Sequence, residues 1–284
     1  MDNWQDYHTV NNHAVNTVVG NVRVLPGLYS PQLGNSRDIL VYLPPSYEAG
    51  SQEYPVLYTH DGQNLFDEIT SFAGEWHVDE TMERLSHEGI EAIIVGIPNA
   101  GTERADEYSP YVDEKYGGGR GDDYLVFIIQ TLKPIIEADF RVQKGPKNTG
   151  LLGSSMGGFI SLYGFFRHPE IFGLAGIMSP SFWFADDAIY PFIAQTPFVK
   201  GRIYMDAGTR EHSSRGRKIS NVIQSRRYYA SVRRMHRLLA KKGYRPRRDL
   251  LYVEEKWAHH EERAWARRLP PAIRFLLDRP PGAD

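Results

Sequence analysis

The 284-residue chain contains no cysteine. This absence excludes disulfides, thiolate nucleophiles and cysteine-ligated metal centres. No apolar run reaches the roughly 20 residues that a membrane helix needs, and the polar start "MDNWQDYHTV" lacks the basic and apolar regions of a signal peptide. The net charge of −2 gives no overall attraction to nucleic acids or anionic membranes. We therefore expect a cytoplasmic globular protein without nucleic-acid or membrane partners.

Apolar runs of strand length alternate with helical patterns from about residue 37 onward. Such runs are typical of parallel strands that helices cover on both faces. The sequence predicts a single α/β domain over 1–284 with its core at about 16–277, a mostly parallel eight-stranded sheet and no large cap domain. The aromatic segment 181–200 is expected to form a short flap. The expected strands are 16–30, 37–44, 54–62, 91–98, 148–155, 173–180, 201–208 and 249–258, and the expected helices are 75–89, 121–140, 155–172 and 220–243.

The stretch "GLLGSSMGGF" (150–159) holds two adjacent serines among glycines. Only Ser155 has a glycine two positions away on both sides, as the motif G-x-S-x-G requires; Ser154 does not. This motif places a nucleophilic serine on a tight turn between a strand and a helix. The residues before the motif have the pattern of a strand and those after it the pattern of a helix, as such a turn requires. Ser155 is therefore the candidate nucleophile, and a glycine-rich turn without chemistry is the alternative.

A serine hydroxyl needs a base, and the base needs an orienting acid. In this arrangement the acid follows a late strand and the base follows the last one. The loop after the late strand offers Glu211, with Asp206 at the strand end as the alternative acid. The segment after the last strand offers His259 and His260, which spacing alone does not separate. A metal site at this histidine pair is not expected, because the pattern H-E-x-x-H is absent.

The oxyanion that forms during attack needs two backbone N–H donors. One is expected from Met156, directly after the serine, and the other from Gln63, in the loop after the strand 54–62. The neighbouring His60 and Asp61 are expected to hold this loop rather than to take part in the chemistry.

Taken together, these motifs resemble the putative-esterase family of α/β-hydrolases, which includes enterochelin esterases, S-formylglutathione hydrolases, feruloyl esterases and mycolyltransferases. The resemblance covers about 37–277 and implies the α/β-hydrolase fold. It implies Glu211 as the acid, through a G-x-x-acid step, and His260 as the base, through His-x-Glu-x-x-Trp. The chain departs from the family at His259, where a small residue is common, and at Glu261, where Asn or Asp is common. The matching segments are "VYLPPSY" (41–47), "HDGQNLFD" (60–67), "VGIPN" (95–99), "RADEYSP" (104–110), "GSSMGG" (153–158), "HPEIFG" (168–173), "SPSFW" (179–183), "DAGTRE" (206–211) and "HEERAW" (260–265).

The sequence therefore predicts a serine carboxylic-ester hydrolase that works through an acyl-enzyme and needs neither cofactor nor metal. The expected partner is a small-molecule ester with an aromatic or anionic part, and the resemblance implies enterochelin-like esters. Trp183 and Phe184 are expected to wall its pocket. An acyltransferase that uses the same residues is the alternative.

Residues 212–248 contain thirteen Lys or Arg and no Asp or Glu. One interpretation is a helix with a solvated basic face. Another is attraction of an anionic substrate, with Arg215 close to the candidate acid. A third is a non-catalytic module that binds a nucleic acid through this stretch. The first interpretation predicts that four apolar side chains pack on the sheet: Tyr228, Val232, Met235 and Leu239.

Two further segments are expected to be structural. Arg104, Glu107 and Tyr108 match a loop of the family and are expected to form an ion pair beside the site. The glycine run 116–123 lacks the Gly-Lys-Ser/Thr ending of a phosphate loop, and it is expected to be a flexible approach to a helix cap.

Overall fold

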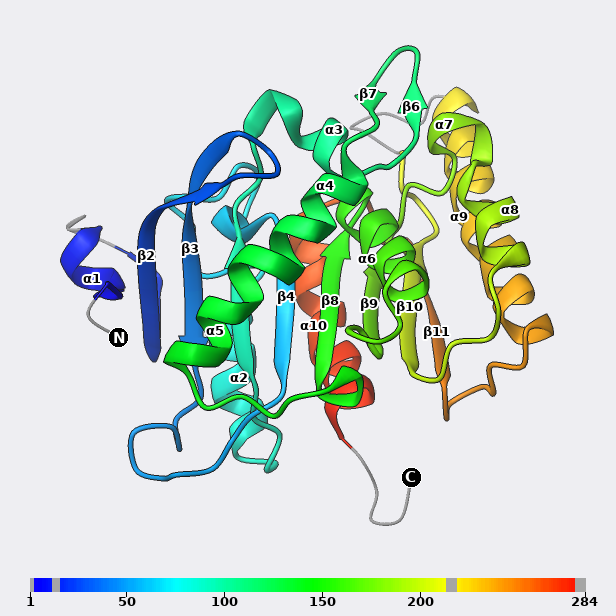
Figure 1. Ribbon diagram of the computed structural model, residues 1–284. Coiled ribbons are helices and arrows are strands. Elements are labelled where there is room, and N and C mark those ends of the chain that lie inside the picture. The colour runs from blue at the N-terminus through cyan, green and yellow to red at the C-terminus, as the bar shows by residue number, and fades with distance from the viewer. Residues whose placement is uncertain (1–2, 12–15, 213–218, 279–284) are drawn as a thin grey trace.

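The computed structural model describes residues 3–11, 16–212 and 219–278. In this part of the chain, a nine-stranded sheet with the order β1-β2-β3-β5-β4-β8-β9-β10-β11 lies between helices on both faces (Figure 1). Its strands are β1 (Gln5–Asp6), β2 (Asn21–Ser30), β3 (Asn35–Leu43), β4 (Val56–His60), β5 (Ile93–Ile97), β8 (Thr149–Ser154), β9 (Leu174–Met178), β10 (Arg202–Gly208) and β11 (Leu250–Glu255).

The sheet is parallel from β5 to β11 and antiparallel from β1 through β3 to β5. The prediction of a mostly parallel α/β-hydrolase sheet is confirmed, but the number of strands is nine rather than eight. The additional strand is β1, whose two polar residues are too few to give an alternating pattern. The strand expected over 16–30 is β2, and its pairing with β3 has a register shift between Leu25 and Leu28.

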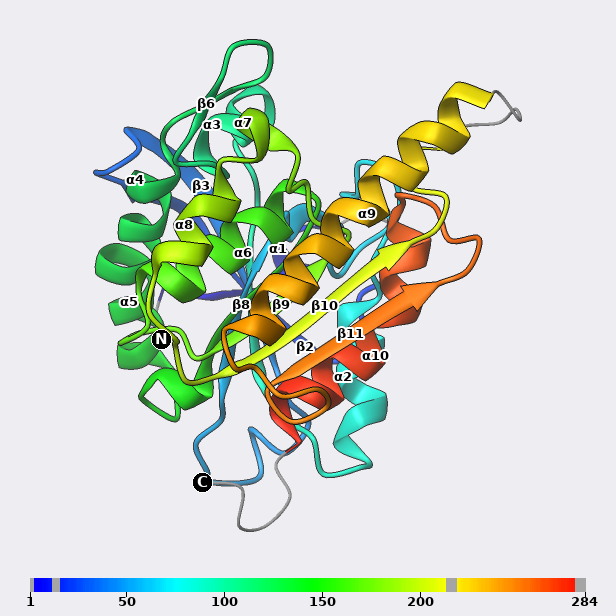
Figure 2. The ribbon, with the colours of Figure 1, turned by 90° about the vertical axis from the view of Figure 1, so that its right-hand side faces the viewer.

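Alternating side chains of the central strands supply two separate cores. In β4, Tyr58 joins the core beneath α4, α6 and α9, whereas Leu57 joins the core beneath α2 and α10. Figures 1 and 2 show α2 and α10 side by side on one face and α4, α5, α6, α8 and α9 on the other. The helices are α1 (Tyr7–Val10), α2 (Val78–Ser86), α3 (Arg104–Glu107), α4 (Gly121–Val126), α5 (Lys133–Asp139), α6 (Met156–Arg167), α7 (Phe184–Asp187), α8 (Ile189–Gln195), α9 (Ile219–Lys241) and α10 (Glu262–Leu277).

The long helix predicted over 121–140 is divided by a π-helical turn at Phe127–Leu132, between α4 and α5. Pro134 stands in the first turn of α5. Proline has no N–H to donate and crowds the preceding turn, so the wider turn before it lets the chain continue in a helical path.

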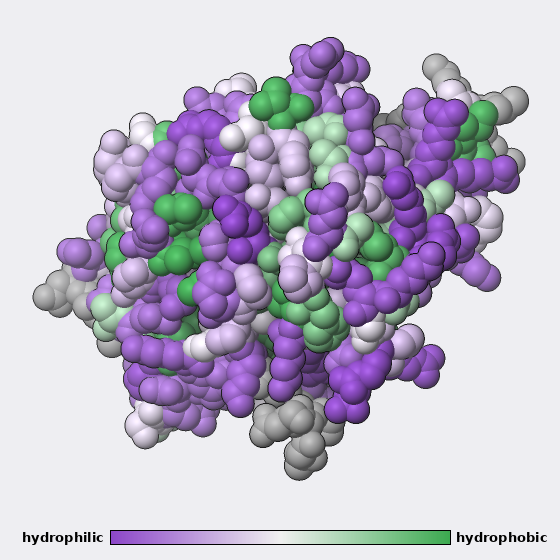
Figure 3. All heavy atoms as spheres, turned by 45° about the vertical axis from the view of Figure 1, so that its right-hand side comes forward, coloured by the Kyte–Doolittle hydropathy of each residue, from purple (hydrophilic) through white to green (hydrophobic). Residues whose placement is uncertain are grey.

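The basic helix α9 packs as its apolar spacing predicts. Tyr228, Val232, Met235 and Leu239 are at most 4% exposed, and the arginines between them face solvent. The face in Figure 3 carries separate groups of hydrophobic side chains among mostly hydrophilic ones. The interpretation as a helix with a solvated face is confirmed for 219–241, and Arg215 lies outside the described residues.

Two predicted loops have more structure than expected. The segment 181–200 holds α7 and α8, whose buried Phe184, Ile189 and Ile193 pack into the core, so it is packed rather than a free flap. In the glycine run 116–123, β7 (Gly117–Gly118) pairs with β6 (Val112–Asp113) in a hairpin, and the Gly118 N–H donates to Asp106 Oδ1 at 2.6 Å.

None of the described helices is long and apolar enough to cross a membrane.

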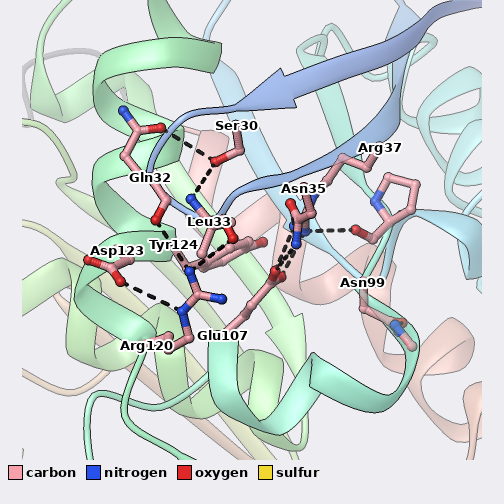
Figure 4. A network of polar contacts seen from close by, with 12 residues as sticks. Ser30, Gln32, Leu33, Asn35, Arg37, Asn99, Glu107, Arg120, Asp123 and Tyr124 are labelled. Carbon is pink, nitrogen blue, oxygen red and sulfur yellow. Dashed lines mark hydrogen bonds and ion pairs between the residues drawn. The ribbon is translucent and has the colours of Figure 1, made fainter.

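A buried ion pair joins β3 to α3 beside the candidate site. Arg37 donates to both carboxylate oxygens of Glu107, at 2.8 and 2.7 Å, and Asn35 donates to the same carboxylate at 2.9 Å. In Figure 4 these side chains converge, while Arg120 binds the carbonyl groups of Gln32 and Leu33 separately. The structural role expected for Glu107 is confirmed.

Replacing Glu107 by alanine would leave the guanidinium of Arg37 buried without its carboxylate, because Arg37 is 8% exposed. We expect the free energy of unfolding to fall by about 3–5 kcal/mol, as measured by urea denaturation. Glu88→Ala is the control, since it removes the exposed pair with Arg274 and should change stability little. Equal losses in the two variants would contradict this expectation.

Candidate active site

Ser155 lies on a strained turn at the carboxyl end of β8, directly before α6. Its φ of 56° and ψ of −118° lie outside the regions that L-residues ordinarily adopt. The flanking glycines allow this turn: a Cβ on Gly153 would lie 2.8 Å from the Gly157 carbonyl carbon and from His60 Cδ2. The close approach of the two glycine backbones to each other and of the His60 side chain to both explains why the motif needs glycine on both sides of the serine.

The Ser155 side chain lies close to residues of two elements, the segment that follows β9 and the helix α9. Its Oγ is 3.1 Å from Ser181 Oγ, which is in turn 3.3 Å from the Tyr228 hydroxyl. The backbone is held as well, because the Ser155 N–H donates to the Met178 carbonyl at 2.9 Å. The Tyr228 ring also lies 5.4 Å from the His260 ring, so Tyr228 lies near both the serine turn and the histidine.

His260 and Glu211 form a hydrogen-bonded pair at the carboxyl ends of β10 and β11. The distance from His260 Nδ1 to Glu211 Oε2 is 2.7 Å. The other oxygen of Glu211 accepts from Ser179 Oγ at 2.7 Å and from the Gly208 N–H. Burial alone would raise the pKa of Glu211, but the hydrogen bonds from His260, Ser179 and Gly208 lower it below its usual value. The carboxylate is therefore ionised at neutral pH and faces the imidazole.

Asp206, the alternative acid, has different partners. Its carboxylate accepts from the Ser179 N–H at 3.0 Å and the Tyr204 hydroxyl at 3.1 Å, and lies 3.1 Å from Arg268 Nε. Complete burial raises the pKa of Asp206 to about 6, although Arg268 opposes that shift. In the described structure Asp206 therefore braces the loop around Ser179, while Glu211 contacts the histidine.

The loop that carries Gln63 is held by Asp61. Arg104 donates to both oxygens of this carboxylate at 2.6 and 2.7 Å, and Asn99 donates to it at 2.7 Å. Burial would raise the pKa of Asp61, but Arg104 and Asn99 lower it. The Gln63 side chain accepts from the Asn99 N–H at 3.2 Å. Because β4 and β8 are neighbours, this loop lies at the same sheet edge as the first turn of α6, which begins at Met156.

His60 is fully buried behind the serine turn. Its Nδ1 is 2.8 Å from the Tyr124 hydroxyl, and its Nε2 has no hydrogen-bond partner among the described residues. Burial, the largest cause, lowers its pKa to about 3. His60 is thus neutral in the folded protein over a wide pH range.

Acid should destabilise the protein through His60. Between about pH 3 and 6.5 the unfolded chain binds a proton at this imidazole and the folded chain does not, so stability falls as pH falls. The expected slope is about 1.4 kcal/mol per pH unit. We expect His60→Asn, measured by urea denaturation between pH 7 and 4.5, to flatten this acid limb. The exposed His87→Ala is the control, and an unchanged slope in His60→Asn would contradict the assignment.

Two exposed aromatic rings lie near this edge of the sheet. Trp183 is 39% and Tyr116 is 48% exposed, and their ring centroids are 5.5 Å apart. Phe184 is only 1% exposed, so its ring supports Trp183 from within the core rather than facing solvent. Of the two predicted pocket residues, only Trp183 is therefore exposed to solvent.

Sequence reasoning did not assign Ser179, Ser181 and Arg268 to the site. Arg268 is 4% exposed and donates to Ser179 Oγ at 3.0 Å, the hydroxyl that in turn donates to Glu211. The two serines belong to the segment "SPSFW", which matches the family. No spacing in the sequence, however, connects them to their partners, which lie more than twenty positions away along the chain.

Comparisons with known proteins agree with this fold. A family model described as "Putative esterase" matches residues 30–276. The protein YbbA of Bacillus subtilis, described as uncharacterized, is 28% identical over 244 residues, which cover 84% of this chain and 92% of YbbA. The siderophore triacetylfusarinine C esterase of Aspergillus fumigatus is 28% identical over 142 residues, which cover 48% of this chain and 47% of that esterase.

Two solved structures have similar folds. The siderophore hydrolase EstA from Aspergillus nidulans has a TM-score of 0.70 at 20% identity, over 91% of this chain and 94% of EstA. The BES protein from Bacillus cereus has a TM-score of 0.67 at 22% identity, over 93% of this chain and 98% of BES. At these identities the likeness is one of fold.

Proposed function

The chain belongs to the putative-esterase family of α/β-hydrolases and is a carboxylic ester hydrolase, and from this premise we propose that Ser155, His260 and Glu211 are its catalytic residues. One observation carries the proposal: the strained turn at Ser155 and the 2.7 Å pair of His260 with Glu211 lie at the same edge of the sheet. In unrelated hydrolases, a histidine that is oriented by a carboxylate activates the serine hydroxyl.

In the proposed mechanism, Ser155 Oγ attacks the ester carbonyl carbon while His260 Nε2 accepts the serine proton. Glu211 accepts a hydrogen bond from His260 Nδ1, which fixes the tautomer and stabilises the imidazolium. The proton then passes to the leaving alcohol and an acyl-enzyme remains. Water, deprotonated by His260, attacks the carbonyl carbon of the acyl-enzyme. The bond from that carbon to Ser155 Oγ then breaks, the acid leaves, and His260 returns the proton to Ser155 Oγ. These three side chains supply every proton transfer.

We propose that the N–H groups of Met156 and Gln63 bind the oxyanion. Met156 is the first residue of α6, where the N–H groups have no partner within the helix and the helix dipole favours negative charge. Gln63 lies in the short 3₁₀ turn Gly62–Asn64, which the bonds of Asp61 hold beside β8. Preorganised donors of this kind stabilise the charge that develops in the transition state.

For the substrate, we propose a small-molecule ester with an aromatic or anionic part. The exposed Trp183 and Tyr116 rings support an aromatic contact near this edge. Two similar proteins are a siderophore triacetylfusarinine C esterase and a siderophore hydrolase, which makes enterochelin-like esters suitable members of the test panel.

A fluorophosphonate probe tests the function directly. We expect turnover of a p-nitrophenyl ester series from acetate to octanoate, inactivation by one equivalent of probe, and an adduct on the peptide that contains Ser155. An adduct at another residue would contradict the proposed nucleophile. A product ester that increases with added alcohol would favour the acyltransferase over the hydrolase.

A further inference from the structure

A cluster of acidic side chains and one histidine lies at the start of α2, on the sheet face opposite α6. Glu75, His77 and Glu80 each offer a ligand atom, and these atoms all lie within 4.8 Å of one another. His77 Nδ1 is 3.0 Å from Glu80 Oε1 and 3.5 Å from Glu75 Oε2. One imidazole nitrogen therefore faces two carboxylates.

Buried oxygens without donors distinguish this cluster from an ordinary acidic surface. Glu75 is 2% and Asp79 0% exposed. Each uses one oxygen for the protein: Glu75 Oε2 accepts from Thr17 Oγ1 at 2.7 Å, and Asp79 Oδ2 accepts from the Val19 N–H at 2.8 Å. Glu75 Oε1, Asp79 Oδ1 and Glu80 Oε2 are buried with no hydrogen-bond partner among the described residues.

Asp79 is directed into the cluster, because its carboxyl group lies within hydrogen-bonding reach of that of Glu80. In the described structure the ion pairs of Glu75 and Glu80 are both with His77. Buried carboxylate oxygens without hydrogen-bond donors are unfavourable, so a positive species placed among them would stabilise the fold.

The chemistry of the donors indicates which species fits. Carboxylate oxygens alone would suit Mg²⁺ or Ca²⁺, whereas an added imidazole nitrogen suits Zn²⁺, Mn²⁺ and related divalent cations. We propose that Glu75, His77, Asp79 and Glu80 bind one divalent transition-metal cation that stabilises the fold. His77 is half exposed, which leaves the outer side of the site open to water.

The position of the site explains what the cation stabilises. Thr17 and Val19 bring the segment before β2 to the cluster, and Glu75 ends the loop that begins after β4. A cation would join both segments to the first turn of α2. The next residue, Trp76, packs on Trp265 with a centroid distance of 5.7 Å, so the site also supports α10.

Metal binding by the full-length protein tests this proposal. After treatment with EDTA and dialysis, Zn²⁺, Mn²⁺, Mg²⁺ and Ca²⁺ are added separately at pH 7.5, with calorimetry for affinity and thermal unfolding for stability. We expect one equivalent of Zn²⁺ or Mn²⁺ to bind. At a free cation concentration a hundredfold above Kd, the folded-to-unfolded ratio should rise roughly a hundredfold.

Variants separate this site from other histidines that bind metals. His77→Ala and Glu80→Gln should each weaken the affinity by at least about tenfold, while His87→Ala, an exposed histidine at the end of the same helix, should not. Circular dichroism verifies folding, and Glu80→Gln keeps the side-chain size if His77→Ala does not fold. The proposal is overturned if none of the four cations stabilises the wild type, the result expected if a shared proton fills the cluster. Unchanged affinity in both variants would overturn it too.

Discussion

Ser155→Ala should lower kcat for p-nitrophenyl acetate hydrolysis by about 10⁴–10⁶-fold, because no other atom can form the acyl-enzyme. Alanine keeps the backbone of the turn and removes only the oxygen, whose contact with Ser181 Oγ is long at 3.1 Å. We therefore expect the urea midpoint of the variant to stay close to that of the wild type.

The adjacent serine provides the matched control. Ser154 is the last residue of β8, is 2% exposed, and belongs to the same glycine-rich turn. Ser154→Ala should keep kcat within several-fold of the wild type. A Ser155→Ala protein that retains more than about one hundredth of the activity, or an equal loss in Ser154→Ala, would refute the assignment of the nucleophile.

Glu211→Gln should lower kcat by about 10³–10⁴-fold with little change in KM. An amide can donate to the imidazole as well as accept, which favours the wrong tautomer, and it carries no charge to stabilise the imidazolium. The low pKa of Glu211 means that this carboxylate remains ionised into the acidic range. The acidic decline of kcat in the wild type should therefore not follow the protonation of Glu211.

Asp206→Asn is the control for this second prediction, since it makes the same chemical change five positions away. It removes the ion pair with the buried Arg268, so we expect a stability loss of about 3 kcal/mol but a fall in kcat of less than tenfold. Measuring kcat and the urea midpoint for both variants separates the two roles. A larger loss of kcat in Asp206→Asn would show that the acids have been assigned in the wrong order.

The sequence by itself determined the fold class and the position of the candidate nucleophile. Continuous apolar runs predicted central strands buried on both faces, and the structure has them, because a strand between two helix layers has no polar face. The spacing of glycines selected Ser155 over Ser154, since that motif describes a local turn in which a Cβ would collide with the backbone. The two-residue β1 was missed because two residues carry no periodicity.

Only the tertiary structure decided which acidic residue contacts the histidine. Asp206 lies in β10 and Glu211 follows it closely, and local patterns do not specify that one carboxylate turns to Arg268 and the other to His260. Likewise, the contact of Ser155 with Ser181 and the contacts of Thr17 and Val19 with the acidic cluster at α2 join segments whose meeting depends on how helices pack on the sheet. Local spacing encodes turns and faces, whereas side-chain partners across the fold depend on packing that no short segment contains.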